Sequence, residues 1–187
     1  MSEPAAMRTL GAMPTVRAMR TVDEQLTRAP TNSIFRLARD VEQWPDLLSH
    51  YRYVRFRESD GLGGGIVEMS ANRPFRIAGA GGPGIDWPTW WLSLMQVDPA
   101  KPSIRFRHIV GITKGMDVEW SFAPDAGGTR VRIVHVWDGP GLPFVGVPVA
   151  KYLIGPVFIH GIASRTLSGL IRTAEQEPAN ANWRARA

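Results

Sequence analysis

Residues 156–176, PVFIHGIASRTLSGLIRTAEQ, decide the fold that we expect for this chain. Small and apolar side chains recur every three or four positions, so they share one face of a helix with 3.6 residues per turn. Pro156 suits the start of this helix, where its missing N–H costs no hydrogen bond. Arg165 and Arg172 fall on the opposite face, toward solvent. The spacing predicts one long helix whose buried stripe consists of Val157, His160, Ser164, Leu167, Ile171 and Ala174.

The predicted stripe is polar at its N-terminal end. His160 and Ser164 face inward there, at positions where a solidly packed core would carry leucine. Buried polar groups require hydrogen-bond partners. This end of the helix is the first indication of a cavity.

Length and composition limit the class of protein. The 187 residues can form one domain with a substantial core, and the absence of cysteine excludes disulfides and thiolate metal sites. The apolar run over residues 142–163 is interrupted by proline, glycine and lysine, so we expect no membrane insertion. The first 14 residues lack the continuous apolar core of a signal peptide. We expect a cytoplasmic protein with one domain over residues 14–177, a flexible leader (1–13) and a flexible tail (178–187).

The formal net charge of +5 raises the question of a nucleic-acid partner. The arginines are scattered and mostly alternate with apolar residues, which is typical of solvated sheet faces. No nucleic-acid-binding motif accompanies them. We therefore expect no nucleic-acid partner, and an acidic carrier protein is the better candidate for a basic surface.

Alternating and β-branched stretches predict seven strands. Two short helices, residues 33–39 and 40–48, are expected after the first strand, with Asp40 capping the second of them and Trp44-Pro45 interrupting it. Residues 72–86 are rich in glycine and proline, which predicts a mobile flap. This order predicts an α+β fold with an antiparallel meander. The predicted strands cover residues 15–26, 51–58, 65–71, 87–97, 103–110, 116–123 and 129–138.

Alternation along the strands predicts which side chains face the long helix. Arg130 and Arg132 must face water, which turns His135 and Trp137 inward. Strand 87–97 is apolar on both faces, so its inward set is either Trp91, Ser93, Met95 and Val97 or Trp90, Leu92, Leu94 and Gln96.

The same argument places His108 on the inward side of residues 103–110. His108, His135 and His160 would then face one interior, beside Trp120 and Trp137. Several polar groups that face a common interior predict a lined pocket.

Three segments resemble the polyketide aromatase/cyclase family (polyketide cyclase/dehydrase) of the START-like, helix-grip superfamily. They are residues 41–48 (VEQWPDLL) with Tyr51, residues 90–93 (WWLS), and residues 116–122 (MDVEWSF) followed by residues 127–129 (GGT). The resemblance extends from Val16 to Glu175. It implies a helix-grip fold, in which a seven-stranded curved antiparallel sheet wraps around the long C-terminal helix and leaves a deep pocket.

The resemblance also implies an activity. In this family an acyl carrier protein delivers a poly-β-ketone, and the pocket walls favour one aldol cyclisation, which is followed by dehydration. One departure concerns Met95, which stands where those enzymes carry an arginine that polarises a substrate carbonyl. The pocket positions carried over by the resemblance are Tyr51, Trp91, Ser93, Met116 and Trp120.

Aldol closure needs a base and a donor that stabilises the enolate oxygen. Histidine suits the proton transfer because its ordinary pKa is about 6.5. We expect His108 or His135 as the acid/base, His160 opposite them on the helix, and Tyr51 and Ser93 as hydrogen-bond donors. The rest of the pocket wall is expected to include Trp91, Met95, Phe106, Met116, Trp120, Trp137 and Ser164.

Each of these histidines could equally be a core residue bonded to a backbone carbonyl. For His50, which lies at a helix end, we favour that interpretation. The histidines lack metal-ligand spacing, and the glycines of residues 61–65 lie between two antiparallel strands rather than before a helix. We therefore expect neither a metal nor a phosphate-bearing cofactor.

Two functions from different classes remain open. The first is a cyclase that uses no metal or organic cofactor. The second is a non-catalytic binding or transport protein for an apolar ligand such as a lipid, a quinone or a polyketide. Met95 favours the second function, and the inward histidines favour the first. A toxin-type interaction module would rest on the fold alone.

Overall fold

The computed structural model describes residues 9–75, 85–139 and 160–177, and it leaves the side chains of residues 73–75, 85–87 and 160 undescribed. Within these residues, seven strands form one antiparallel sheet in the order β1-β7-β6-β5-β4-β3-β2. This topology confirms the predicted meander, which β1 joins beside β7. The strands are β1 (Met19–Thr27), β2 (Tyr51–Ser59), β3 (Gly65–Phe75), β4 (Ile85–Asp98), β5 (Ser103–Gly111), β6 (Asp117–Asp125) and β7 (Gly128–Trp137).

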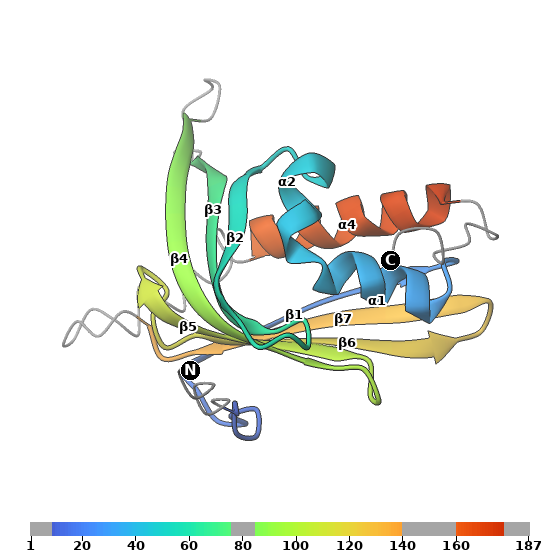
Figure 1. Ribbon diagram of the computed structural model, residues 1–187, viewed down its shortest axis with the longest axis horizontal. Helices are drawn as coiled ribbons and strands as arrows, with labels where there is room; N and C mark the ends of the chain where they lie inside the picture. Colours follow the sequence, from blue (N-terminus) through green and yellow to red (C-terminus); the bar gives the residue numbers. More distant parts are fainter. Residues whose placement is uncertain (1–8, 76–84, 140–159, 178–187) are drawn as a thin grey trace, which may run out of the picture.

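The helices lie on the concave side of this sheet. The sheet bends around α4 (His160–Gln176), and α1 (Thr31–Arg39) and α2 (Trp44–Leu47) lie on the same side (Figure 1). A short 3₁₀ helix, η1 (Val41–Gln43), joins α1 to α2. The arrangement confirms the helix-grip fold. No helix in the described part of the chain is long and apolar enough to cross a membrane.

From Leu167 onward α4 carries the predicted stripe, whereas Ser164, also predicted to face inward, is only half-buried. Leu167, Ile171 and Ala174 are buried, whereas Arg165 and Arg172 are exposed. Residues 156–159, where we expected the helix to begin, lie outside the described residues. The helix is also bonded to the edge strand β1, because Gln25 Nε2 donates to Ser168 Oγ at 2.9 Å.

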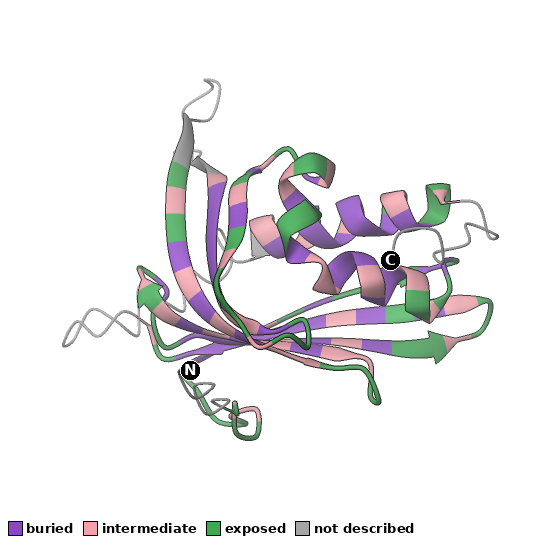
Figure 2. Cartoon of the chain, viewed as in Figure 1, coloured by how far each residue is buried: buried purple, intermediate pink, exposed green. Residues whose placement is uncertain are grey.

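The structure settles the inward set of β4. Trp91, Ser93 and Met95 are at most 5% exposed, whereas Trp90 is 50% exposed. Along β4, purple bands of buried residues alternate with pink bands of intermediate ones (Figure 2). His108 and His135 are buried on the concave face, as the arginine alternation predicts.

Strands β3 and β4 reach further into the expected flap than the sequence suggests. They remain paired as far as Phe75 and Ile85, although Pro74 lies on this stretch. Strand β2 pairs with β3 no further than Ala71, and beyond Asn72, whose N donates to His50 O, no described strand pairs with the other side of β3. A proline is tolerated on such an edge because it removes no needed donor. The remaining flap, residues 76–84, lies outside the described residues.

The first strand and the short helices also differ in detail. Strand β1 begins at Met19 rather than residue 15, and α1 begins at Thr31. The helix predicted over residues 40–48 is divided into η1 and α2 at Trp44-Pro45, where the interruption was expected, but the Asp40 side chain makes no capping hydrogen bond. Pro45 explains the division, because proline cannot continue a helix but fits its first turn.

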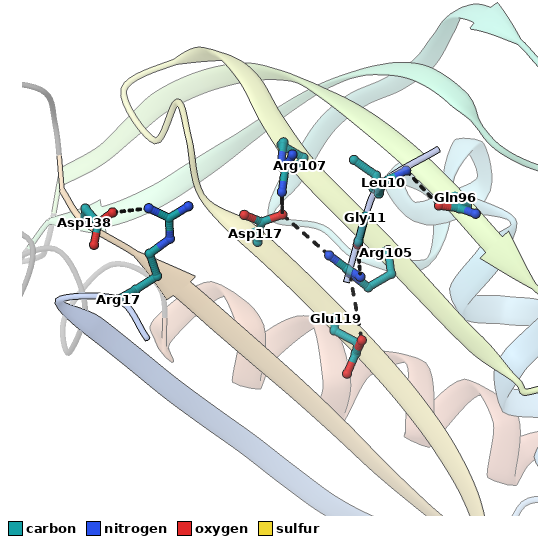
Figure 3. Close-up of polar contacts among 9 residues, drawn as sticks. All are labelled: Leu10, Gly11, Arg17, Gln96, Arg105, Arg107, Asp117, Glu119 and Asp138. Atoms are coloured by element: carbon teal, nitrogen blue, oxygen red, sulfur yellow. Dashed lines mark hydrogen bonds and ion pairs between the residues drawn. The ribbon is translucent and has the colours of Figure 1, made fainter. Parts of the chain in front are cut away.

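The convex face of the sheet carries a charged cluster beneath the N-terminal segment (Figure 3). Asp117 is only 1% exposed, and its Oδ1 accepts a hydrogen bond from Arg107 Nε at 2.9 Å. Arg105 lies beside the same carboxylate, and its Nη1 donates to Gly11 O at 3.1 Å. Leu10 N donates to Gln96 Oε1 at 3.1 Å. The chain is therefore bonded to the convex face at residues 10 and 11, while the boundaries of the leader and tail stay predictions.

Two glycines of α4 test how tightly the helix is held. A Cβ at Gly169 would lie 2.2 Å from Leu48 Cδ2, and Leu48 is buried, whereas a Cβ at Gly161 would meet no described atom within 4 Å. We expect Gly169→Ala to lower the free energy of unfolding by about 1–2 kcal/mol, because overpacking outweighs the gain in helix propensity. Gly161→Ala should raise it by up to about 1 kcal/mol.

Urea denaturation of both variants measures this difference directly. Gly161→Ala is the matched control, because it makes the same chemical change on the same helix. Equal stabilisation by the two substitutions would show that Leu48 moves aside freely and that α4 is not closely held at Gly169.

Candidate functional site

A cavity of about 70 Å³ lies between the concave face of the sheet and α4. Side chains from α2, α4, the β5–β6 turn and strands β2 to β7 contribute to its wall. Most of the wall is aromatic or apolar, and the polar atoms come from histidine, threonine and tyrosine. The lining residues are Trp44, Tyr51, Met69, Trp91, Phe106, His108, Thr113, Met116, Val118, Trp120, His135, Ile162, Ala163 and Thr166.

Seven predicted site residues contribute to this lining: Tyr51, Trp91, Phe106, His108, Met116, Trp120 and His135. Four others lie elsewhere. Ser93, Met95 and Trp137 are buried outside the described lining, and Ser164 is half-buried on α4. The side chain of His160 is outside the described residues, so its expected position opposite the other histidines stays a prediction.

His108 is held at the β5–β6 turn. Its Nδ1 lies 2.6 Å from Thr113 Oγ1, and both side chains are buried. The backbone of the turn fixes this pair, since His108 N donates to Met116 O at 2.9 Å and Met116 N donates to Thr113 O at 3.0 Å. The ring of Trp91 stacks on His108 with centroids 5.8 Å apart. The stacked Trp91 ring thus fixes the plane of the imidazole, and the Thr113 hydroxyl fixes the position of its Nδ1.

His135 has a similar but longer contact on β7. Its Nδ1 lies 3.3 Å from Thr21 Oγ1. The two residues are direct partners in the antiparallel register of β1 and β7. The edge strand therefore contributes a hydrogen-bond partner for a histidine of the wall, which the sequence pattern of β1 did not reveal.

His50 is more closely connected to the site than the sequence suggested. Its Nε2 lies 3.0 Å from Thr166 Oγ1 on α4, and Thr166 lines the cavity. Burial, and then the positive charge of Arg165, lower the pKa of His50 to about 4, so the imidazole is neutral near pH 7. From its position at a helix end we expected His50 to bond to a backbone carbonyl. The contact with Thr166 could not be predicted in this way, because the two residues lie far apart in the sequence.

Threonine is the residue type that the sequence reading missed. Each histidine with a described side chain, namely His50, His108 and His135, has a ring nitrogen within 3.3 Å of a threonine hydroxyl. Because a hydroxyl can donate or accept, it satisfies either tautomer of the imidazole. The threonines lie on three different elements, so no local motif marks them.

Ser93 and Met95 occupy the inward face of β4 beside the cavity. Ser93 is fully buried, and its Oγ has no hydrogen-bond partner among the described residues. A buried polar atom without a partner costs about 1–3 kcal/mol and calls for a functional or solvent explanation. Its cross-strand neighbour on β5 is His108. Met95 lies opposite Phe106 and is buried in the core.

The aromatic part of the wall forms a connected series of rings. Trp44 lies edge-on to Tyr51 with centroids 5.1 Å apart, and 5.8 Å from Trp120. Such faces suit a flat, apolar ligand, and the imidazoles could act on its oxygen atoms or acidic protons. Benzene occupies an apolar cavity of about 150 Å³ in another protein, so a larger ligand requires side chains of this wall to move.

Several solved structures share the fold of this chain. They include TTHA0849 from Thermus thermophilus, with 20% identity over 83% of this chain and 97% of that chain and a TM-score of 0.65. The Zhui aromatase/cyclase from a Streptomyces species has 19% identity over 84% and 93% of the two chains and a TM-score of 0.64. A START superfamily protein from Mycobacterium smegmatis has 14% identity over 84% and 97% and a TM-score of 0.62. These likenesses show the fold.

A family model agrees with them. The model described as polyketide cyclase / dehydrase and lipid transport matches residues 27–157, which is well over half of the chain. The matched region contains most of the cavity wall, including His108 and His135. The chain therefore belongs to the polyketide cyclase/dehydrase and lipid transport family.

Proposed function

We propose that this protein folds a carrier-bound poly-β-ketone inside the cavity and promotes one aldol cyclisation, followed by dehydration. The observation that supports this most is the presence of two imidazoles, His108 and His135, in a wall made mainly of aromatic rings. An acyl carrier protein would deliver the chain, and the net charge of +5 favours such an acidic partner.

In this proposal His108 transfers the proton. Thr113 engages Nδ1, so we assign the proton transfer to Nε2. Nε2 takes a proton from a methylene between two carbonyls, and the resulting enolate carbon attacks a ketone further along the same chain. The new alkoxide recovers the proton from the imidazolium. Loss of that hydroxyl together with a neighbouring C–H proton releases water and leaves a C=C bond, without any oxidant or reductant.

The hydroxyls of Tyr51 and Ser93 are the proposed donors to the enolate oxygen. Tyr51 lines the cavity, whereas Ser93 is buried outside the described lining, so its Oγ, which has no described partner, would have to turn toward the ligand to donate. Because methylene protons between two carbonyls are already acidic, most of the rate gain would come from holding the chain in one register. We assign this positioning to the aromatic wall, with His135 as a second proton carrier.

A second candidate function is binding or transport of an apolar ligand without catalysis. The observation that favours it is the chemistry of residue 95, where Met95 packs into the core in place of the arginine expected from the family resemblance. The described lining of the cavity also contains no arginine or lysine. The family description itself includes lipid transport.

The two functions differ in the products formed from a carrier-bound poly-β-ketone. We expect the wild-type protein to raise the share of one cyclised product, and His108→Gln to reduce that gain at least about 10-fold through loss of the base. His135→Gln should alter the ratio less. Chromatography of the products, with thermal unfolding of each variant, measures both effects.

Ile112→Ala is the matched control for this experiment. Ile112 lies in the same turn as Thr113 but is 63% exposed, so its truncation should leave the product ratio unchanged. An unaltered ratio with wild-type protein, together with tight binding of a lipid extracted from cells, would support the transport function. A large loss of melting temperature in His108→Gln without any change in products would make His108 a core residue.

Met95 gives a further prediction about the family arginine. Since Met95 is 4% exposed and packs opposite Phe106, Met95→Arg would bury a charge in an apolar environment. We expect a loss of about 3–5 kcal/mol in the free energy of unfolding, measured by urea denaturation. Met95→Leu, which keeps volume and polarity, should lose less than about 1.5 kcal/mol. A stable Met95→Arg variant with a sharpened product ratio would show instead that the cavity can still accept the arginine.

A further inference from the structure

His50, Thr166 and Tyr51 form a continuous polar chain that ends at the cavity. His50 Nε2 lies 3.0 Å from Thr166 Oγ1, and Thr166 Oγ1 lies 3.5 Å from Tyr51 Oη. The rings of His50 and Tyr51 are also in contact, with centroids 4.8 Å apart. Tyr51 and Thr166 both line the cavity, whereas His50 lies behind them.

We propose that His50 is a positioning residue, which acts through Thr166 to fix the Tyr51 hydroxyl as a hydrogen-bond donor toward a carbonyl oxygen in the cavity. The donor role of Tyr51 rests on the proposed function. The chain of contacts behind Tyr51 does not, so the two can be tested separately.

The backbone holds His50 and Tyr51 in this arrangement. Two hydrogen bonds fix the turn that leads into β2: Asn72 N donates to His50 O at 2.7 Å, and Tyr51 N donates to Leu48 O at 2.9 Å. Thr166 is only 1% exposed on α4, so bulk water does not compete for its hydroxyl. The contact between His50 and Thr166 therefore joins two rigid elements. It can fix the orientation of the Thr166 hydroxyl, which would otherwise be set by water.

The protonation state of His50 decides which groups donate and which accept along the series His50, Thr166 and Tyr51. With its pKa lowered to about 4, the ring is neutral near pH 7 and carries one N–H. If this N–H is on Nε2, it donates to Thr166 Oγ1, and the Thr166 hydroxyl donates to Tyr51 Oη. A phenol oxygen that accepts this bond directs its own proton elsewhere, and we assign that proton to the substrate carbonyl.

Two matched probes measure the donor without requiring the natural substrate. The fluorescent ketone 2-acetylnaphthalene and the hydrocarbon 2-ethylnaphthalene differ by one carbonyl oxygen. We expect wild-type protein to prefer the ketone, and Tyr51→Phe to lower the ratio of dissociation constants about 5- to 10-fold, as expected for one hydrogen bond. His50→Phe and Thr166→Val should lower this preference at least about 3-fold.

The variants are chosen to separate positioning from packing. His50→Phe keeps the ring contact with Tyr51, and Thr166→Val keeps the shape of the side chain. Thr166→Ser restores the hydroxyl and should restore the preference. A preference that falls in Tyr51→Phe but is unchanged in His50→Phe and Thr166→Val would overturn the positioning role while leaving the cavity function intact. No effect of Tyr51→Phe would remove the donor role of Tyr51 as well.

A measurement on the wild-type protein alone covers the cases in which a variant does not fold or neither probe binds. NMR of ¹⁵N-histidine-labelled protein at pH 7 should show a solvent-protected Nε2–H of His50 with a nuclear Overhauser effect to the Thr166 methyl group. An imidazole protonated only at Nδ1, or an Nε2–H that exchanges as fast as that of an exposed histidine, would overturn the proposal.

Discussion

The need to provide hydrogen-bond partners for buried and half-buried imidazoles governs the inner face of this protein. The described side chains of His50, His108 and His135 each have a threonine hydroxyl beside a ring nitrogen, and these threonines come from α4, the β5–β6 turn and β1. Leaving such a group without a partner costs about 1–3 kcal/mol. The polar lining therefore forms only when the sheet is curved, β1 is paired to β7 and α4 is in place. The same interactions that complete the fold also shape the cavity.

Against this background, Ser93 and Met95 stand out on the inward face of β4. The Ser93 hydroxyl is buried without a described partner, and Met95 fills the core at the position where the family resemblance implies an arginine. Stable folds usually give every buried polar group a hydrogen-bond partner, and exceptions are found mostly at functional sites. The Ser93 hydroxyl is such an exception, next to a cavity whose described imidazoles all have partners. The described wall contains no arginine or lysine, so no guanidinium or ammonium group of this wall can polarise a ligand carbonyl.

The two faces of the sheet have different roles. The concave face holds the cavity, whereas the convex face holds Asp117 between Arg105 and Arg107 under the N-terminal segment (Figure 3). A buried carboxylate with two guanidinium partners keeps strands β5 and β6 in register without contributing to the cavity. Because β5 and β6 also carry His108 and Trp120 on their other side, the ion pairs outside help to position the wall inside.

The sequence by itself determined the order of elements, the stripe of α4 from Leu167 onward and the inward faces of β5 and β7, because helical spacing and arginine alternation are local properties. It also indicated seven residues of the cavity wall. Only the tertiary structure decided the inward face of β4, where both faces are apolar and alternation carries no information. The partnership of His50 with Thr166, and of His135 with Thr21, was likewise beyond the sequence, since each contact joins residues more than 100 positions apart. Local patterns specify which way a side chain points, but its partner depends on how the sheet closes over the helix.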